Sequence, residues 1–319
     1  MPGRGMSTKM KVTILVALVL ALLIVGFLSG ELAKSMFDAT IEPLHIELEK
    51  PQLPAQPVTD PLFGDFSLTN TILAAWLTII LLVGVCYAAT RKMRAVPSGL
   101  QNLVEAALEA LLNFVQGVAG EKNGRRFFPV IATIFLFVIT NAWLGLLPGF
   151  GSITAHGPEG EVTLLRNAST DINVPLALAL VSFVVVEFWG LSAVGFSSYM
   201  RRFVNLGRLR LGMGQLLRGK LKSAATSIFS GAIDVFVGAL EALSEVMRIV
   251  SFTFRLFGNM TAGEILLIVV PFLVPWVVAL PFYGLELLVG FVQALIFAGL
   301  TLVFAVIAVA PHGAKQEAA

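Results

Sequence analysis

The sequence predicts an all-α integral membrane protein with upright transmembrane helices, an amphipathic interfacial helix and a long, steeply tilted C-terminal helical hairpin. Two observations favour this fold class. Of the 319 residues, 57% are hydrophobic and only 13% are charged, with a mean hydropathy of +0.87, whereas soluble domains carry about 25% charged residues. The hydrophobic residues also form long runs, and a membrane-spanning helix needs about 20 of them in succession.

Four of these runs are long enough to cross a membrane once, at residues 12–29, 70–90, 127–147 and 172–199. Two more, 228–270 and 275–310, are too long for one upright crossing. The first of them has 43 residues, and as one helix it would extend about 65 Å against a hydrocarbon core of about 30 Å. The two runs are therefore either broken or steeply tilted as a hairpin, whose turn we place at Pro271, Pro275 and Pro281.

The first run follows Lys9 and Lys11, an arrangement found in secretory signals and in retained membrane anchors. Because no convincing cleavage site of small residues follows it, we favour a retained anchor. In either case residues 31–66 lie on the outer side of the membrane.

Loop charges orient the other helices. Residues 91–126 are rich in arginine and lysine, and residues 200–223 hold seven basic residues and no acid. Residues 31–66 carry seven acids, and residues 149–171 carry three acids against the single base Arg166. The basic loops are therefore expected in the cytoplasm and the acidic loops outside.

Residues 97–120 place Leu103, Leu111 and Phe114 on one side of a helix and Gln101 and Glu105 on another. This pattern predicts an amphipathic helix at the cytoplasmic interface, although a partner protein would suit the apolar side equally well.

The elements divide the chain into three expected parts. Residues 1–66 form the anchor or signal segment and an external loop. Residues 67–223 form transmembrane helices with the cytoplasmic amphipathic helix and a basic loop. Residues 224–319 form the tilted hairpin and a short C-terminal tail.

A polar stripe runs through the otherwise apolar residues 228–270. At about 100° per residue, six polar side chains fall within a sector of about 80°: Asp234, Glu241, Glu245, Arg248, Arg255 and Asn259. Placing an ionisable group inside a membrane is costly, so such groups indicate a functional site with a partner.

Arg255 is the clearest functional candidate in the stripe. Arginine keeps its charge in a protein, and no acid stands three or four residues from Arg255, so its counter-ion must come from elsewhere. Arg248 differs, because Glu245 stands three residues before it and can neutralise it locally.

Further polar residues lie off the stripe. Glu264 falls on another face of the same run, and Glu286 shares a face of the last run with Gln293. We expect Glu241 and Glu245 to line one aqueous path and Glu264 and Glu286 to line another, so the hairpin is predicted to carry ions.

Other kinds of site are not indicated. The single cysteine, Cys86, allows no intrachain disulfide, and the three histidines are widely separated, so we expect no metal site. No phosphate-binding loop and no paired nucleophile and base appear, so we expect no cofactor, no nucleic-acid partner and no catalytic centre such as that of an intramembrane hydrolase. A stand-alone secondary transporter or ion channel is the alternative, but the repeated halves of many transporters are not seen.

The run from Arg255 to Glu264, Arg-Leu-Phe-Gly-Asn-Met-Thr-Ala-Gly-Glu, closely resembles the signature of subunit a of the rotary F-type ATP synthases. Residues 286–301 are similar to the last helix of that family, and residues 141–148 and 171–173 match two more of its segments. The resemblance covers about residues 60–310. The segment before residue 60, the basic insert 201–223 and Asp234 depart from the family pattern.

The resemblance implies roles for individual residues. Arg255 corresponds to the essential membrane arginine of the family, and Gln293 corresponds to its last-helix glutamine. Further half-channel positions correspond to Glu241, Asn259, Glu264 and Glu286, the last of which is histidine in some members.

The resemblance also implies partners and a mechanism. Subunit a abuts a ring of c-subunit proteolipids, and the complex includes the b-subunit peripheral stalk and the soluble ATPase sector. Protons enter one aqueous half-channel, ride on the carboxylates of the rotating ring and leave by the other half-channel. Arg255 would attract each deprotonated carboxylate and block a direct leak. We therefore expect a non-catalytic stator subunit in the lipid of a bacterial plasma (inner) membrane, with the choice of proton or sodium made mainly by the ring.

Overall fold

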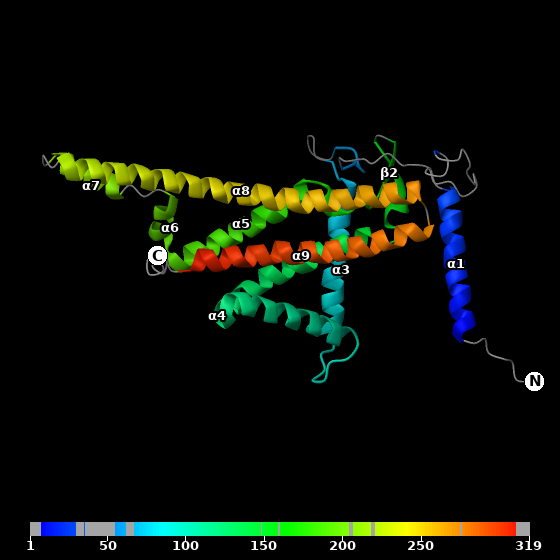
Figure 1. Ribbon diagram of the computed structural model, residues 1–319. Helices are drawn as coiled ribbons and strands as arrows, with labels where there is room; N and C mark the ends of the chain where they lie inside the picture. Colours follow the sequence, from blue (N-terminus) through cyan, green and yellow to red (C-terminus); the bar gives the residue numbers. More distant parts are fainter. Residues whose placement is uncertain are drawn as a thin grey trace, which may run out of the picture. The chain divides into compact units, whose positions relative to one another are not determined.

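The computed structural model describes residues 8–29, 35, 55–61, 67–147, 149–158, 160–203, 207–217, 221–274 and 276–310. Among them are six helices long and apolar enough to cross a membrane (Figure 1). These are α1 (Thr8–Ser29), α3 (Asn70–Thr90), α4 (Leu100–Gly145), α5 (Asn173–Val194), α8 (Leu221–Leu273) and α9 (Ala279–Val309). The predicted all-α membrane fold class is confirmed.

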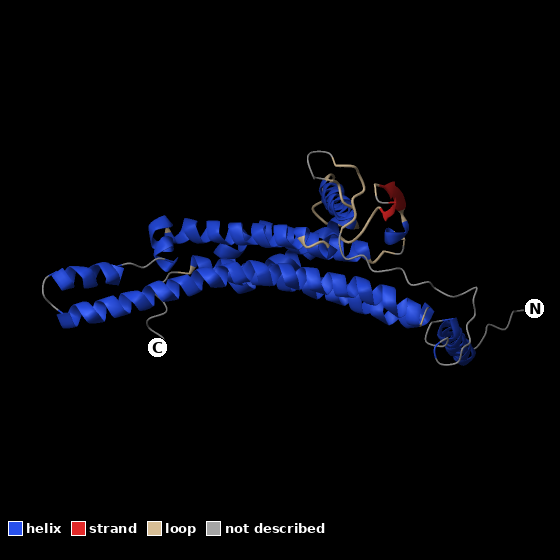
Figure 2. Ribbon diagram, turned by 90° about the horizontal axis from the view of Figure 1, so that it is seen from above, coloured by secondary structure: helices blue, strands red, loops and turns tan. Residues whose placement is uncertain are grey.

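Short elements connect the long helices. A small β-hairpin, drawn in red in Figure 2, is formed by β1 (Thr154–Gly157) and β2 (Gly160–Thr163), which pair antiparallel with Thr154 opposite Thr163. The remaining short elements are η2 (Phe150–Ser152), η3 (Ala168–Thr170), α6 (Phe196–Phe203), α7 (Gly207–Leu217) and η4 (Trp276–Val278).

α8 is one continuous helix of 53 residues, so the alternative in which residues 228–270 are broken is wrong. At about 1.5 Å per residue it extends about 80 Å, far more than the hydrocarbon core of about 30 Å. It ends at Leu273, and η4 leads into α9, so the two helices join within the proline-rich stretch 271–281, although Pro271 lies inside α8 and Pro281 inside α9. The steep tilt of the hairpin, which this length favours, stays a prediction.

α4 joins the predicted amphipathic helix to the third span. The two parts meet at Gly120, whose φ of 75° interrupts the helix. In the first part Leu103 and Phe114 are exposed, as expected of side chains that contact lipid or a partner, whereas Leu111 of the same predicted side is buried. Gln101 is instead buried, because its side-chain amide both accepts from and donates to the backbone of Arg94.

The basic stretch 200–223, expected to be a loop, contains helix. α7 and the start of α8 lie in it, and α7 packs on the first turns of α8 through two glycines. A Cβ at Gly212 would lie 2.7 Å from Ile228, and one at Gly231 would lie 2.7 Å from Leu209. Basic side chains do not prevent a helix from forming, so charge alone could not exclude this one.

The chain divides into two compact units. The first comprises residues 1–79, 138–171 and 257–293. The second comprises residues 80–137, 172–256 and 294–319. The helices α3, α4, α8 and α9 each contribute to both units.

Buried hydrogen bonds organise the first unit. Thr71 of α3 donates to Asp171 at 3.0 Å, and the side-chain amide of Asn141 on α4 donates to Asn167 at 2.8 Å. Because buried polar groups need such partners, these bonds fix the segment that leads from the β-hairpin into α5.

Small and aromatic side chains pack the second unit. Ala294 and Ala298 of α9 are fully buried, and small residues of this kind let another helix approach closely. The Phe252 ring of α8 lies 4.9 Å from that of Phe297 and 5.9 Å from that of Phe304, both on α9. This packing holds α8 against α9 beside the polar stripe.

Candidate functional site

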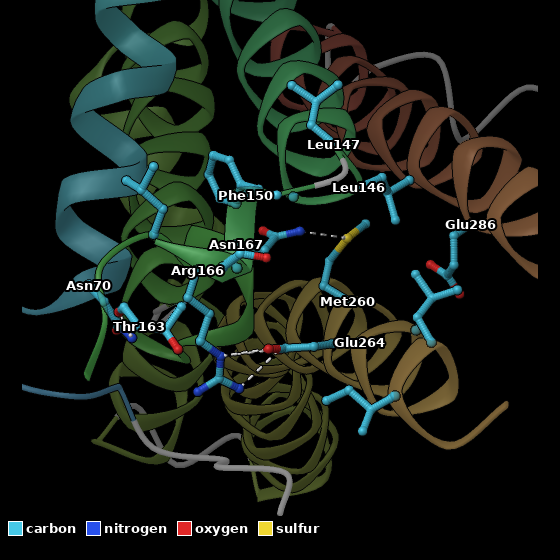
Figure 3. Close-up of a pocket in the computed structure, with 18 of the residues that line it drawn as sticks. Asn70, Leu146, Leu147, Phe150, Thr163, Arg166, Asn167, Met260, Glu264 and Glu286 are labelled. Carbon is cyan, nitrogen blue, oxygen red and sulfur yellow. Dashed lines mark hydrogen bonds and ion pairs between the residues drawn. The ribbon is translucent and has the colours of Figure 1, made fainter. Parts of the chain in front are cut away.

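The first unit contains a cavity of about 700 Å³. Its walls come from the end of α4, the segment through the β-hairpin to η3, and the helices α8 and α9. Three charged side chains labelled in Figure 3 reach it: Arg166, Glu264 and Glu286. The structure therefore brings the two predicted acids to one cavity and adds an arginine.

Arg166 binds Glu264 through two of its nitrogens. Nε lies 2.9 Å from Oε1 and 3.2 Å from Oε2 of Glu264, and Nη2 lies 3.0 Å from Oε2. The two side chains are 10% and 30% exposed, respectively. In Figure 3 the Glu264 carboxylate points toward the guanidinium. A bidentate pair of this kind is among the stronger charged hydrogen bonds in proteins.

Glu286 has a different environment in the same cavity. It projects from α9 and is 8% exposed, and its carboxyl group lies so close to Gly263 of α8 that a Cβ there would overlap it. Among the described residues Glu286 has no hydrogen-bond or ion-pair partner. One acid of this cavity is thus paired, and the other lies against a glycine.

Asn259 of α8 and Gln293 of α9 contact each other between the two helices of the helical hairpin. Nδ2 of Asn259 donates to Oε1 of Gln293 at 2.7 Å. Gln293 is 2% exposed, and its Nε2 is a buried donor with no hydrogen-bond partner in the described part of the chain. Leaving such a group unpaired costs about 1–3 kcal/mol, so this amide is available to an acceptor from another molecule.

The second unit contains its own cavity of about 690 Å³, lined by side chains of α5, α8 and α9. Glu241 and Glu245, which the sequence predicts on one aqueous path, both line it. Ser244, Glu187 and Arg248 complete its polar wall.

Arg248 lies between two carboxylates in this cavity. Its Nη2 is 3.2 Å from Oε1 of Glu187 and 2.5 Å from Oε2 of Glu245. Its guanidinium also lies 4.6 Å from the centre of the Phe304 ring, and the Tyr199 hydroxyl donates to Glu187. The predicted local pair with Glu245 is confirmed, and Glu187 of α5 is a second partner that spacing within one helix cannot show.

Arg255 is half-buried, and within the described ranges no carboxylate pairs with it. Its Nη2 lies 3.3 Å from Oγ of Ser251, and its guanidinium lies 5.8 Å from the centre of the Phe252 ring. The prediction that no nearby acid on its own helix neutralises Arg255 is confirmed for this part of the chain.

The remaining member of the stripe, Asp234, lines neither cavity and pairs with Arg208 of α7 at 3.3 Å. In the described residues no group of three or more His, Cys, Asp or Glu side chains is placed to hold a metal ion.

Sequence reasoning did not assign Arg166 or Glu187 to a site. One feature of the sequence could have indicated a role for Arg166, because it is the single base in the acidic stretch 149–171. Glu187 stands alone in an apolar helix, and its partner Arg248 lies 61 residues further along the chain.

The chain is similar to known proteins over most of its length. The family model described as ATP synthase A chain matches residues 72–306. The chain is similar to ATP synthase subunit a of Gloeobacter violaceus, with 36% identity over 243 residues, 76% of this chain and 85% of the relative. The corresponding protein of Campylobacter jejuni is 34% identical over 229 residues, covering 72% and 84%. That of Geobacter sp. (strain M21) is 32% identical over 235 residues, covering 74% and 85%.

Proposed function

The chain belongs to the ATP synthase subunit a family, the ion-translocating subunits of the membrane sector, and on that premise we propose that it forms two aqueous half-channels beside a c-subunit ring. The cavity with Glu264 and Glu286 belongs to the outer half-channel. The cavity with Glu241 and Glu245 belongs to the cytoplasmic half-channel. Protons pass from one to the other on the carboxylates of the ring, and their flow turns the ring and drives ATP synthesis.

Loop charges support this assignment of sides. The first cavity includes Arg166 and the β-hairpin, which belong to the acidic stretch 149–171 expected outside. The second cavity includes Glu187 of α5 and the part of α8 that follows the basic stretch 200–223, expected in the cytoplasm.

The observation that carries the proposal is the charge of Arg255. Its guanidinium has no carboxylate partner in the described part of the chain, whereas Arg166 and Arg248 are both paired with acids. A permanent charge in a membrane needs a counter-ion, and a deprotonated ring carboxylate is one. Because arginine does not release its proton, Arg255 also prevents protons from passing directly between the half-channels. The Nε2 of Gln293, which has no hydrogen-bond partner among the described residues, is a donor for a ring carboxylate as well.

The proposed assembly follows from this role. The ring of c subunits covers the face with Arg255, the b-subunit stalk holds the chain as part of the stator, and the soluble ATPase sector acts through the complex. The chain is a multi-pass membrane protein, and we place it in a bacterial inner membrane.

ATP-driven acidification of inverted membrane vesicles tests the proposal. We expect Arg255→Ala and Arg255→Gln to abolish acidification while the subunit still assembles with the ring. Arg255→Lys should largely fail as well, since lysine is a compact charge that can lose its proton when buried.

Arg125→Ala is the matched control, because Arg125 is exposed and pairs only with the neighbouring Glu121 in the described structure. It should pump normally. Normal acidification with Arg255→Ala would contradict the proposal, and so would purification of the active chain without a proteolipid ring.

A further inference from the structure

We propose that Arg166 is a positioning residue that holds Glu264 as a fixed anion, so that Glu286 is the acid of the outer cavity that exchanges protons. This inference rests on the proposed function of the cavity and assigns different roles to its two carboxylates.

The segment that carries Arg166 is held in place. The Asn167 side chain accepts hydrogen bonds from the Asn141 amide at 2.8 Å and from the backbone N–H of Ser169 at 2.9 Å. The backbone N–H of Ala168 donates to Asn141 at 3.3 Å. A guanidinium anchored beside such a segment has little freedom to leave its carboxylate, and its own side chain is only 10% exposed.

The geometry of the pair opposes proton exchange at Glu264. Both carboxylate oxygens accept hydrogen bonds from Arg166, at 2.9 to 3.2 Å. A proton added to either oxygen would face a group that never loses its charge. It would also break the two-point hydrogen bonding that stabilises the pair. The geometry therefore holds Glu264 as the hydrogen-bonded partner of Arg166.

Glu286 has none of these restraints. No described residue donates to it, and its carboxyl group rests against the backbone of Gly263, where no side chain intervenes. The same cavity wall holds both acids, so a proton that enters the cavity can reach Glu286 without displacing a cation.

The pair of Arg166 and Glu264 changes the net charge that surrounds Glu286. The titratable or charged groups that line it are Glu161 of β2, Arg166, Glu264 of α8, and Tyr283 and Glu286 of α9. Arg166 and Glu264 cancel each other, so Glu264 does not repel a second anion in the cavity. Without Arg166, two carboxylates would share the site, and a like charge disfavours ionisation of its neighbour. The ion pair of Arg166 with Glu264, called the clamp below, thus sets the pH at which Glu286 exchanges protons.

The test is passive proton flux through the complete membrane sector, stripped of the soluble ATPase and measured as a function of pH. Flux is normalised to the amount of c ring assembled with each variant. Glu286→Gln should reduce flux severely at every pH. Arg166→Gln should move the midpoint of the flux curve upward by about one pH unit, because an unpaired Glu264 then repels the Glu286 anion. Glu264→Gln should move it downward, because it removes a negative charge from the cavity while Arg166 stays.

The double variant Arg166→Gln with Glu264→Gln separates positioning from simple structural support. It removes both charges, so the midpoint should return to that of the unaltered complex with most of the flux. Arg166→Lys keeps the charge but cannot make the two-point contact, so it should move the midpoint less than Arg166→Gln does. Glu121→Gln, which removes an exposed acid that lines neither cavity, is the control and should change neither midpoint nor flux.

The outcomes distinguish this inference from the function it rests on. Two results would contradict the role of the clamp but not the proposed half-channel. One is that Glu264→Gln abolishes flux as completely as Glu286→Gln, and the other is that the double variant keeps the shifted midpoint of Arg166→Gln. If Glu286→Gln leaves flux unchanged, the cavity is not the pathway. If the Arg166 single variants do not assemble, the double variant decides, because its assembly with a normal midpoint supports the clamp and a shifted midpoint overturns it.

Discussion

At the scale of single residues, the structure adds partners that the sequence could not supply. Helical periodicity identified the face with Arg255 and the local pair of Arg248 with Glu245. It could not identify Arg166 with Glu264 or Arg248 with Glu187, because each of these pairs joins two segments of the fold. Spacing along one helix shows which side chains share a face, but the residues that contact this face depend on tertiary packing.

Gly263 provides one test at this scale. An alanine there would displace the carboxyl group of Glu286, which is the flexible end of its side chain, so the protein should fold and assemble with Glu286 moved. We expect Gly263→Ala to reduce ATP-driven acidification several-fold at unchanged assembly. Gly284→Ala is the matched control on α9, where an added Cβ would meet nothing within 4 Å. Equal pumping in the two variants would show that the position of Glu286 is unimportant.

Arg248 gives a second test, and the structure changes what is expected of it. Removing it leaves both Glu187 and Glu245 in the interior without their shared cation, and breaking a buried pair costs about 3–5 kcal/mol. Arg248→Ala should therefore lower the amount of assembled subunit, whereas Arg255→Ala lowers pumping alone.

The triple change Arg248→Ala, Glu187→Gln and Glu245→Gln removes the cation and both acids together. We expect it to restore assembly, measured as subunit retained with the c ring after purification. An Arg248→Ala variant that assembles normally would show that the cluster does not stabilise the fold.

At the scale of elements, hydropathy located every long helix, because twenty apolar residues in succession have few alternatives to spanning a membrane. It could not decide whether residues 228–270 are broken, and the structure shows one continuous α8. It also did not indicate α7, since a basic, glycine-containing stretch is equally typical of a loop.

The packing of α4 on α9 can be tested by a disulfide. Trp143 Nε1 donates to the Leu287 carbonyl at 3.1 Å, and a Cβ at Gly290 would lie 3.0 Å from that of Ala142. This is near the separation of about 3.5–4.5 Å between bridged Cβ atoms. On a Cys86→Ser background, Ala142→Cys with Gly290→Cys should form a disulfide on mild oxidation. The control pair Ala142→Cys with Leu288→Cys should not, because Leu288 is exposed on α9.

At the scale of the whole molecule, the central feature is that the described residues of each compact unit line an acidic cavity. The sequence predicted which acids belong together. Glu241 and Glu245 lie close together in the first long run, whereas Glu264 and Glu286 lie on the two sides of the proline-rich turn. It could not predict the cavities themselves, since their walls include the β-hairpin and α5, whose contacts come from tertiary packing.

Thiol labelling tests whether the cavities open to opposite sides. Ser152 lines the first cavity and Ser244 lines the second. On the Cys86→Ser background, a membrane-impermeant thiol reagent should reach Ser152→Cys only in right-side-out vesicles and Ser244→Cys only in inverted ones. Labelling of both from the same side would exclude two half-channels that open to opposite faces.

The amide of Gln293 affects the stability of the subunit before it assembles with its partners. Its Nε2 is buried and has no acceptor among the described residues. Any molecule that binds only the folded form shifts the folding equilibrium toward that form. A ring carboxylate that accepts this bond would therefore stabilise the newly made subunit as well as serve transport. Copies that never meet a ring would unfold more often and be degraded faster by membrane proteases, which would match the number of subunits to the number of rings.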